Sequence, residues 1–256
     1  MNDLAKYCLA WLLLLTTSVS AQNDWENETV FGIGREEPRA TFFPFERVEE
    51  AWVNQPNTSD RFLDLNGKWH FNLAKKPSER PTEFHKNEFD VSNWDLIDVP
   101  ANWEVAGYDQ PHYLDVNYPF ANNPPLIQKH YNPVGSYKRE FTIPSNWKGQ
   151  QVFVYLGAVK SAYYLWINGE KCGYSQGSKT PTEFNITDKL VEGANTISLE
   201  VYRWSDGSYL EDQDFWRVSG IEREVYIYTI PNQHIADVHI DQGLTNNYKD
   251  GQLKIT

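Results

Sequence analysis

Cysteine is nearly absent from this sequence, which contains only two among 256 residues. Cys8 lies in an apolar run near the N-terminus, so Cys172 alone would remain once that run is removed. An internal disulfide is then excluded. The histidines show no metal-ligand spacing; they are His70, His85, His112, His130, His234 and His239. Neither a disulfide-stabilised scaffold nor a cysteine-histidine metal centre is expected.

Basic residues are also scarce. Lys and Arg number 23 against 35 Asp and Glu, which gives a formal net charge of -12 and a pI near 4.9. Nucleic acids and anionic membrane surfaces both require clustered positive charge, so neither is an expected partner. Aromatic residues, by contrast, make up 15% of the chain. They suit a β-sandwich core and sugar stacking equally well.

Residues 1–21 are typical of a secretory signal peptide. Lys6 supplies a basic residue, residues 9–15 form a short apolar core, and small residues precede Gln22. The alternative is a membrane anchor, but a bilayer span needs about 20 apolar residues. We therefore expect cleavage after Ala21 and a periplasmic or secreted protein.

Short apolar or alternating runs separated by Gly, Pro and Asn indicate an all-β domain at residues 61–231. No helix of ordinary length with a 3.6-residue period is evident. The clearest strand candidates are residues 94–99, 137–143, 151–156, 161–167, 171–175, 195–202 and 222–230. The Asn168-Gly169 pair predicts a hairpin turn between two of them. Such regularly spaced short strands indicate a β-sandwich.

The segments on either side of this domain differ from it. Residues 22–60 are polar and contain three prolines, which indicates an extended N-terminal arm. After a boundary at Pro231-Asn232, residues 234–240 and 252–256 read as two strands joined by a polar link. Two strands alone are marginal in water, so we expect residues 232–256 to be the truncated start of a second domain.

Two long loops are the best candidates for function. Residues 107–133 and 203–221 lack a period and are rich in aromatic, acidic and amide side chains. Aromatic rings pack on the C–H face of a sugar, and carboxylates accept hydrogen bonds from its hydroxyls. The alternative is a solvated acidic loop whose aromatics cover the core. Within the second loop, we expect two arginines to pair with nearby acids: Arg203 and Arg217, with Glu211, Asp212 or Asp214.

Five motifs in the same order resemble glycoside hydrolase family 2 β-galactosidases, the large bacterial lactases. They are Val-Pro-Ala-Asn-Trp-Glu at 99–104 with Gly-Tyr-Asp at 107–109, Tyr-Pro at 118–119 with Asn-Pro-Pro at 123–125, Asn-Pro-Val-Gly-Ser-Tyr at 132–137, residues 157–177, and residues 203–221. The resemblance covers roughly residues 38–231. It implies a galactose-binding-like jelly roll at residues 61–231, followed by the start of an immunoglobulin-like β-sandwich.

The resemblance also implies the function. The family hydrolyses terminal non-reducing β-D-galactose residues with retention, using two glutamates of a downstream (β/α)₈ barrel. Such a barrel needs about 250 residues of its own, so no residue of this chain is expected to be catalytic. The chain alone should therefore be inactive. Its expected partners are the enzyme's remaining domains and a galactoside substrate. The alternative is a stand-alone carbohydrate-binding module. Relatives are often oligomers, which makes a homo-oligomer a further expectation.

Two candidate substrate-binding residues follow from the motifs. Asp206 matches the family aspartate on the galactose 6-hydroxyl side, which also ligates Na⁺; Mg²⁺ is implied for the full-length enzyme only. The alternative role for Asp206 is to begin a turn with Gly207. Asp115 stands where the family has a sugar-contacting asparagine, so it accepts hydrogen bonds but cannot donate them. Asn117 could replace it after a register shift. Trp103 and Trp216 are expected to support the loops from below, with a role as sugar platforms as the alternative.

Overall fold

The computed structural model describes residues 22–256. The signal peptide predicted for residues 1–21 lies outside the described residues. Within 22–256 no helix is both long enough and apolar enough to cross a membrane. The short helices are η1 (Asp24–Glu26), α2 (Val48–Val53), η2 (Pro56–Thr58), η3 (Pro77–Glu79), η4 (Ser145–Trp147), η5 (Thr187–Lys189) and η6 (Asp206–Tyr209).

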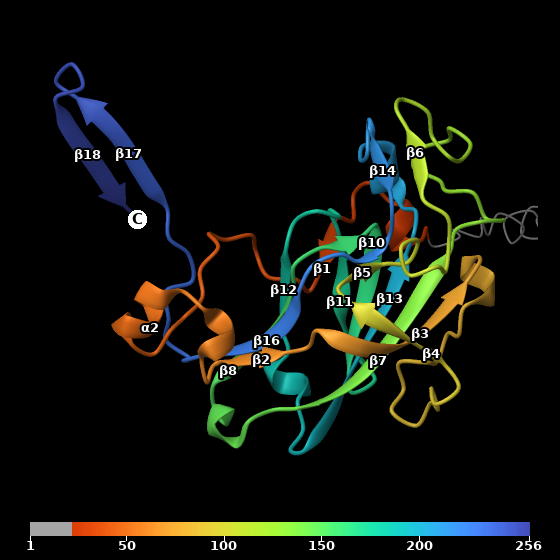
Figure 1. Ribbon diagram of the computed structural model, residues 1–256, viewed down its shortest axis with the longest axis horizontal. Helices are drawn as coiled ribbons and strands as arrows, with labels where there is room; N and C mark the ends of the chain where they lie inside the picture. Colours follow the sequence, from red (N-terminus) through yellow and green to blue (C-terminus); the bar gives the residue numbers. More distant parts are fainter. Residues whose placement is uncertain (1–21) are drawn as a thin grey trace, which may run out of the picture.

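Two antiparallel sheets pack face to face as a jelly-roll β-sandwich (Figure 1). In spatial order the larger sheet contains β1 (Gly32–Ile33), β11 (Glu170–Gln176), β10 (Ala162–Ile167), β13 (Ala194–Tyr202), β7 (Val134–Thr142), β3 (Gly67–Ala74) and β4 (Asp95–Val99). The smaller contains β12 (Thr182–Asn185), β8 (Gln151–Leu156), β16 (Val225–Ile230) and β2 (Phe62–Asp64). The prediction of an all-β sandwich is confirmed.

Three smaller groups of strands complete the fold. Their members are β5 (Ala101–Asn102), β15 (Gly220–Ile221) and β9 (Val159–Lys160); β14 (Phe215–Arg217) with β6 (His112–Leu114); and β17 (Ile240–Thr245) with β18 (Asp250–Ile255). The β6–β14 ribbon stands at one end of the sandwich, and the β17–β18 hairpin projects from the other (Figure 1). The two long loops are therefore tied together at one end of the molecule.

The core lies between the two sheets and follows the strand period. Leu165 and Leu199 of the larger sheet and Ile227 of the smaller are fully buried members of one apolar cluster. Burying one such side chain stabilises the fold by about 1.5–3 kcal/mol. The predicted Asn168-Gly169 turn is confirmed: both residues have positive φ, 51° and 81°, as a type I′ hairpin requires.

The N-terminal arm is held against the sandwich and is only partly extended. Its strand β1 pairs with β11, where a Cβ on Gly173 would lie 1.9 Å from the Ile33 carbonyl oxygen, so only glycine permits this approach. The Trp25 ring stacks on Tyr202 with 4.9 Å between centroids. Farther along, α2 forms a six-residue helix in a segment that we predicted to be extended.

The predicted strand at residues 234–240 is wrong in position. Strand pairing begins at His239, whose N–H donates to the Thr256 carbonyl oxygen at 2.9 Å. The preceding residues run beside the arm instead, where the Asp237 carboxylate accepts a hydrogen bond from the Ala40 N–H at 2.8 Å. Every residue of the β17–β18 hairpin is exposed. Membership of an immunoglobulin-like domain therefore stays a prediction.

Candidate functional site

The structure brings the two candidate loops together. Strand β6 of the first loop pairs with β14 of the second, with Tyr113 opposite Trp216. The pairing extends one step further, because the Asp214 N–H donates to the Asp115 carbonyl oxygen at 3.0 Å. The loop that carries Asp115 therefore borders the loop that carries Asp206, although the described contacts include no hydrogen bond between their carboxylates.

A serine cluster fixes the backbone that presents Asp206. Ser205 and Ser208 form a reciprocal capping box at the start of η6. Both hydroxyls contact Ser161, which lies between β9 and β10, at 2.6 Å and 3.1 Å between Oγ atoms. Ser161 immediately precedes β10, so the rigid sheet positions this turn. Asp206 does begin a turn with Gly207, and this turn is also the element that holds its carboxylate in place.

The Asp206 carboxylate is half-buried and incompletely satisfied. Its Oδ2 lies 3.5 Å from Gln176 Nε2, whereas its Oδ1 is buried without a hydrogen-bond partner among residues 22–256. Gln176 Oε1 is orphaned in the same way. Burial raises the pKa of Asp206, and the Glu28 carboxylate raises it further. Two desolvated hard oxygens suit a cation such as Na⁺. The described part of the chain contains no group of three or more His, Cys, Asp or Glu ready to hold a metal.

Asp115 occupies a more open position. It is exposed at the outer end of the β6–β14 ribbon, next to the Leu114–Phe215 pair, and its carboxylate makes no hydrogen bond among the described residues. Both oxygens are therefore free to accept hydrogen bonds from a ligand. Asn117, the alternative contact, is exposed in the same loop. Neither side chain needs to break a protein contact to bind a polar ligand.

The expected pairing of Arg203 with the loop acids is wrong. The Arg203 guanidinium is fully buried and instead contacts the carboxylates of Asp109 and Glu104. One of its nitrogens, Nη2, also donates to the Gln110 carbonyl oxygen at 2.8 Å. Glu104 in turn accepts a hydrogen bond from the Ser219 N–H at 2.9 Å. Arg203 thus joins the two candidate loops to each other rather than bracing one of them.

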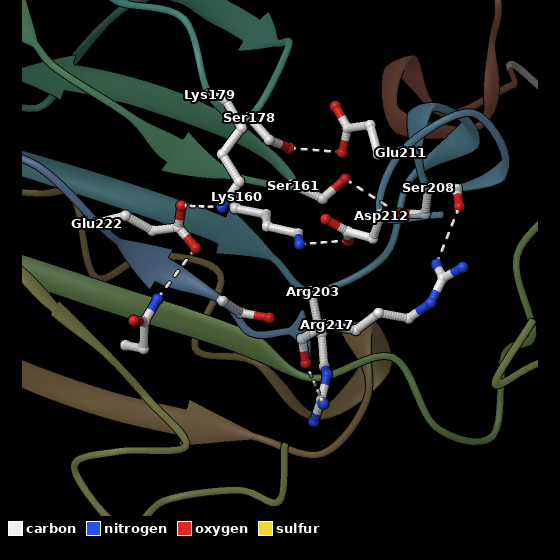
Figure 2. Close-up of polar contacts among 12 residues, drawn as sticks. Lys160, Ser161, Ser178, Lys179, Arg203, Ser208, Glu211, Asp212, Arg217 and Glu222 are labelled. Carbon is white, nitrogen blue, oxygen red and sulfur yellow. Dashed lines mark hydrogen bonds and ion pairs between the residues drawn. The ribbon is translucent and has the colours of Figure 1, made fainter. Parts of the chain in front are cut away.

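Arg217 also lacks the expected acid partner. Its Nη1 donates to the Ser208 carbonyl oxygen at 3.3 Å. The loop acids bind other groups, as Figure 2 shows: Lys160 contacts Asp212, and the Ser178 hydroxyl donates to Glu211 at 2.6 Å. Sequence reasoning did not identify Lys160. The sequence feature that could have indicated it is a single lysine in the otherwise apolar run that precedes Ser161.

The two tryptophans have different environments. Trp103 is fully buried in the main core, as predicted for a residue that supports the loops. Trp216 is 52% exposed, so the prediction that it lies beneath the loops is wrong. Its ring contacts Tyr113 across the ribbon at 5.3 Å between centroids. Phe215, on the opposite face of the same strand, is 50% exposed as well, because neither face of this two-stranded ribbon is covered by a second sheet.

Comparison with known proteins agrees with this fold. The sugar-binding domain model of the glycosyl hydrolases family 2 matches residues 62–231. The chain is 46% identical to a β-galactosidase of Priestia megaterium over 94% of its own length and 24% of the relative's. It is 42% identical to a Clostridium acetobutylicum β-galactosidase, over 90% of its own length and 26% of the relative's. The chain thus spans about a quarter of these curated relatives.

Solved structures give a more distant match to the same fold. A Bacteroides uniformis β-glucuronidase aligns with a TM-score of 0.55 and 25% sequence identity, over 71% of this chain and 20% of that one. A Bacteroides vulgatus β-glycosidase aligns with a TM-score of 0.54 and 22% sequence identity, over 76% of this chain and 24% of that one. These likenesses show the fold. The family model matches more than half of the chain, and the chain therefore belongs to the glycosyl hydrolases family 2 and carries that family's sugar-binding domain.

Proposed function

We propose that this chain is the N-terminal, sugar-binding part of a β-galactosidase that hydrolyses terminal non-reducing β-D-galactose residues. The observation that carries the proposal is the 46% identity to a β-galactosidase across nearly the whole chain. The geometry supports it, since one ribbon joins the loops of Asp115 and Asp206 at one end of the sandwich. The described residues contain no (β/α)₈ barrel, so the proton donor and the nucleophile are assigned to a barrel outside them.

In this proposal the chain orients the sugar. The Asp115 carboxylate accepts hydrogen bonds from sugar hydroxyls, because its oxygens are exposed and free. Asp206 and Gln176 would hold Na⁺ near the 6-hydroxyl, and the cation would supply positive charge that offsets the half-buried carboxylate. The exposed Asp115 carboxylate, which no cation offsets, would repel the carboxylate of a uronic acid. That repulsion favours a galactoside over a glucuronide.

The first test is a hydrolysis assay on the chain from Gln22 onward, with calorimetry against galactose. We expect no hydrolysis and very weak or no galactose binding, because the described chain supplies only one side of the site. Hydrolysis that persists in Asp206→Ala would contradict the assignment of the chemistry to another domain. Addition of a family 2 polypeptide that carries the barrel should restore galactosidase activity. Lack of restoration, with measurable sugar binding by the chain alone, would favour the stand-alone binding module.

The cation proposal predicts a pH-dependent effect of sodium. We expect Na⁺, compared with an equal concentration of tetramethylammonium, to raise the thermal midpoint of the chain at pH 7. Burial raises the pKa of Asp206 above its ordinary 3.8, and only the ionised form binds the cation. The stabilisation should therefore fade as pH falls through this raised pKa. Asp206→Asn should abolish it at every pH, whereas Asp188→Asn, an exposed control, should not.

Localisation and assembly belong to the same proposal. The apolar leader supports export to the periplasm or the medium, and the family resemblance supports Mg²⁺ in the full-length enzyme and assembly into a homo-oligomer. Because the formal net charge is -12, nucleic acids and anionic membranes are not among the partners that we propose.

A further inference from the structure

A concave surface lies apart from the Asp115 and Asp206 carboxylates. It is a cleft of about 810 Å³ at the edge of the larger sheet, between the end of β3, the start of β4 and residues 107–112. Neither Asp115 nor Asp206 lines it. We call it the β3–β4 cleft. Its volume falls in the range of about 300–1,000 Å³ that is typical of small-molecule sites.

The cleft is lined by aromatic rings that the core already holds in place. Trp94 is half-buried, and its ring packs against Phe84 and Phe89 at 5.9 Å between centroids in each case. Tyr108 meets Phe71 edge-on at 4.8 Å. These rings are therefore fixed before any ligand arrives. A ligand that stacks on them would lose little free energy to ordering the protein.

One wall of the cleft is set by the buried Arg203. Its guanidinium holds the Asp109 carboxylate, which also accepts hydrogen bonds from Tyr131 and from the Gln110 N–H, the latter at 2.8 Å. Burial, together with the hydrogen bond to Asp109, raises the pKa of Tyr131 to about 12, so its hydroxyl stays protonated at neutral pH. Asp109 is thus neutralised and saturated by the protein. It shapes the cleft and leaves ligand binding to other groups.

Free amides supply the remaining polarity. Asn72, Asn93 and Gln110 line the cleft, and the side chains of all three make no hydrogen bond within residues 22–256. An amide both donates and accepts hydrogen bonds, which is what neighbouring hydroxyls of a sugar require. The exposed charges, Lys75 and Asp95, are of opposite sign. With Asp109 already paired, the lining has no net charge that would attract an anion or a cation.

We propose that the β3–β4 cleft is a second saccharide-binding site that takes a neutral oligosaccharide. The rings of Trp94 and Tyr108 pack on the C–H faces of the sugar, and the amides of Asn93 and Gln110 bind its hydroxyls. An oligosaccharide fills more of the cleft than a monosaccharide does. This binding does not depend on the galactosidase proposal, because it uses neither Asp206 nor Asp115.

The test is calorimetry and saturation-transfer NMR on the chain from Gln22 onward, with β-1,4-galactotetraose and cellotetraose as probes. We expect at least one tetrasaccharide to bind at millimolar or lower concentration. The variant Asn93→Ala/Gln110→Ala should bind it at least tenfold more weakly, because two hydrogen bonds are lost. Both side chains are exposed and make no protein contact by hydrogen bond, so the variant should fold normally, which near-UV circular dichroism checks.

Two controls separate this site from the other one. Asn146→Ala removes an exposed amide elsewhere on the surface and should leave the affinity unchanged. Asp206→Ala should also leave it unchanged, even if it abolishes galactosidase activity in a completed enzyme. The proposal is overturned if neither tetrasaccharide binds the wild-type chain, if the double variant binds as tightly as wild type, or if Asp206→Ala weakens binding as much as the double variant does.

Discussion

Lys160→Ala should lower the free energy of unfolding by about 3–5 kcal/mol, the typical result of leaving a buried charge without its partner. Lys160 and Asp212 form an ion pair whose side chains are only 1% and 4% exposed. Burial lowers the pKa of Lys160, and the Asp212 carboxylate opposes that shift. Removal of the ammonium leaves the carboxylate desolvated. Urea denaturation followed by tryptophan fluorescence measures the loss.

The chain offers a matched control for this prediction. Lys179 pairs with Glu222, but the lysine is 42% exposed. Solvent-exposed pairs contribute about 0–1 kcal/mol, so Lys179→Ala should have a small effect. Lys160→Met/Asp212→Asn, which removes both charges, should recover much of the lost stability. An equal effect of Lys160→Ala and Lys179→Ala would show that the buried pair does not hold the loop.

The same pair affects the proposed function. Asp212 has a φ of 61°, a left-handed conformation that is uncommon outside glycine and that the ion pair helps to hold. It lies six residues after Asp206 in the loop that also contains the serine contacts and the Arg217 bond to the Ser208 carbonyl oxygen. Loss of the pair should therefore loosen the loop before the sheets unfold. Limited proteolysis within residues 203–219 should accelerate in Lys160→Ala under conditions where the β-sheet circular dichroism is unchanged.

Arg203→Met should destabilise the fold by a similar amount, about 3–5 kcal/mol. The guanidinium is fully buried and faces two carboxylates, those of Glu104 and Asp109, which are 0% and 8% exposed. Methionine fills much of the volume but leaves both acids uncompensated. Because Arg203 joins the two loops, the variant should also lose any function that depends on the relative position of Asp115 and Asp206. Urea denaturation of the variant and the wild type at pH 7 measures the loss in free energy of unfolding.

The pH dependence of this variant has a definite sign. Burial already raises the pKa of Glu104 in the wild-type chain, and the Arg203 charge opposes that rise. Without Arg203, the folded-state pKa of Glu104 rises further above its unfolded value. A raised acid pKa gives stability that is present at low pH and lost as pH rises through the folded pKa. The difference between Arg203→Met and wild type should therefore grow from pH 4 to pH 7. A constant or shrinking difference would contradict the assigned contact.

Strand positions could be predicted wherever local chemistry decides them. The hairpin at Asn168-Gly169 follows from two residues that readily adopt positive φ, and the strand at residues 151–156 follows from a continuous apolar run. Prediction failed at residues 234–238, where the expected strand has no strand partner and the Asp237 carboxylate binds the arm instead. Alternating hydrophobicity predicts which face of a strand would be buried. It does not predict whether a neighbouring strand is present to pair with it.

The sequence by itself determined the all-β class, the family and the two loops that contain Asp115 and Asp206, because these depend on local patterns and on motifs that are contiguous in the chain. Only the tertiary structure decided which charges meet. Arg203 was expected to bind acids about ten residues away, yet it binds Glu104 and Asp109, roughly a hundred residues away in the chain. Lys160 meets Asp212, which lies about fifty residues later in the chain. Ion pairs of this kind form where sheet topology brings distant loops together, and a single sequence carries no local signal of that distance.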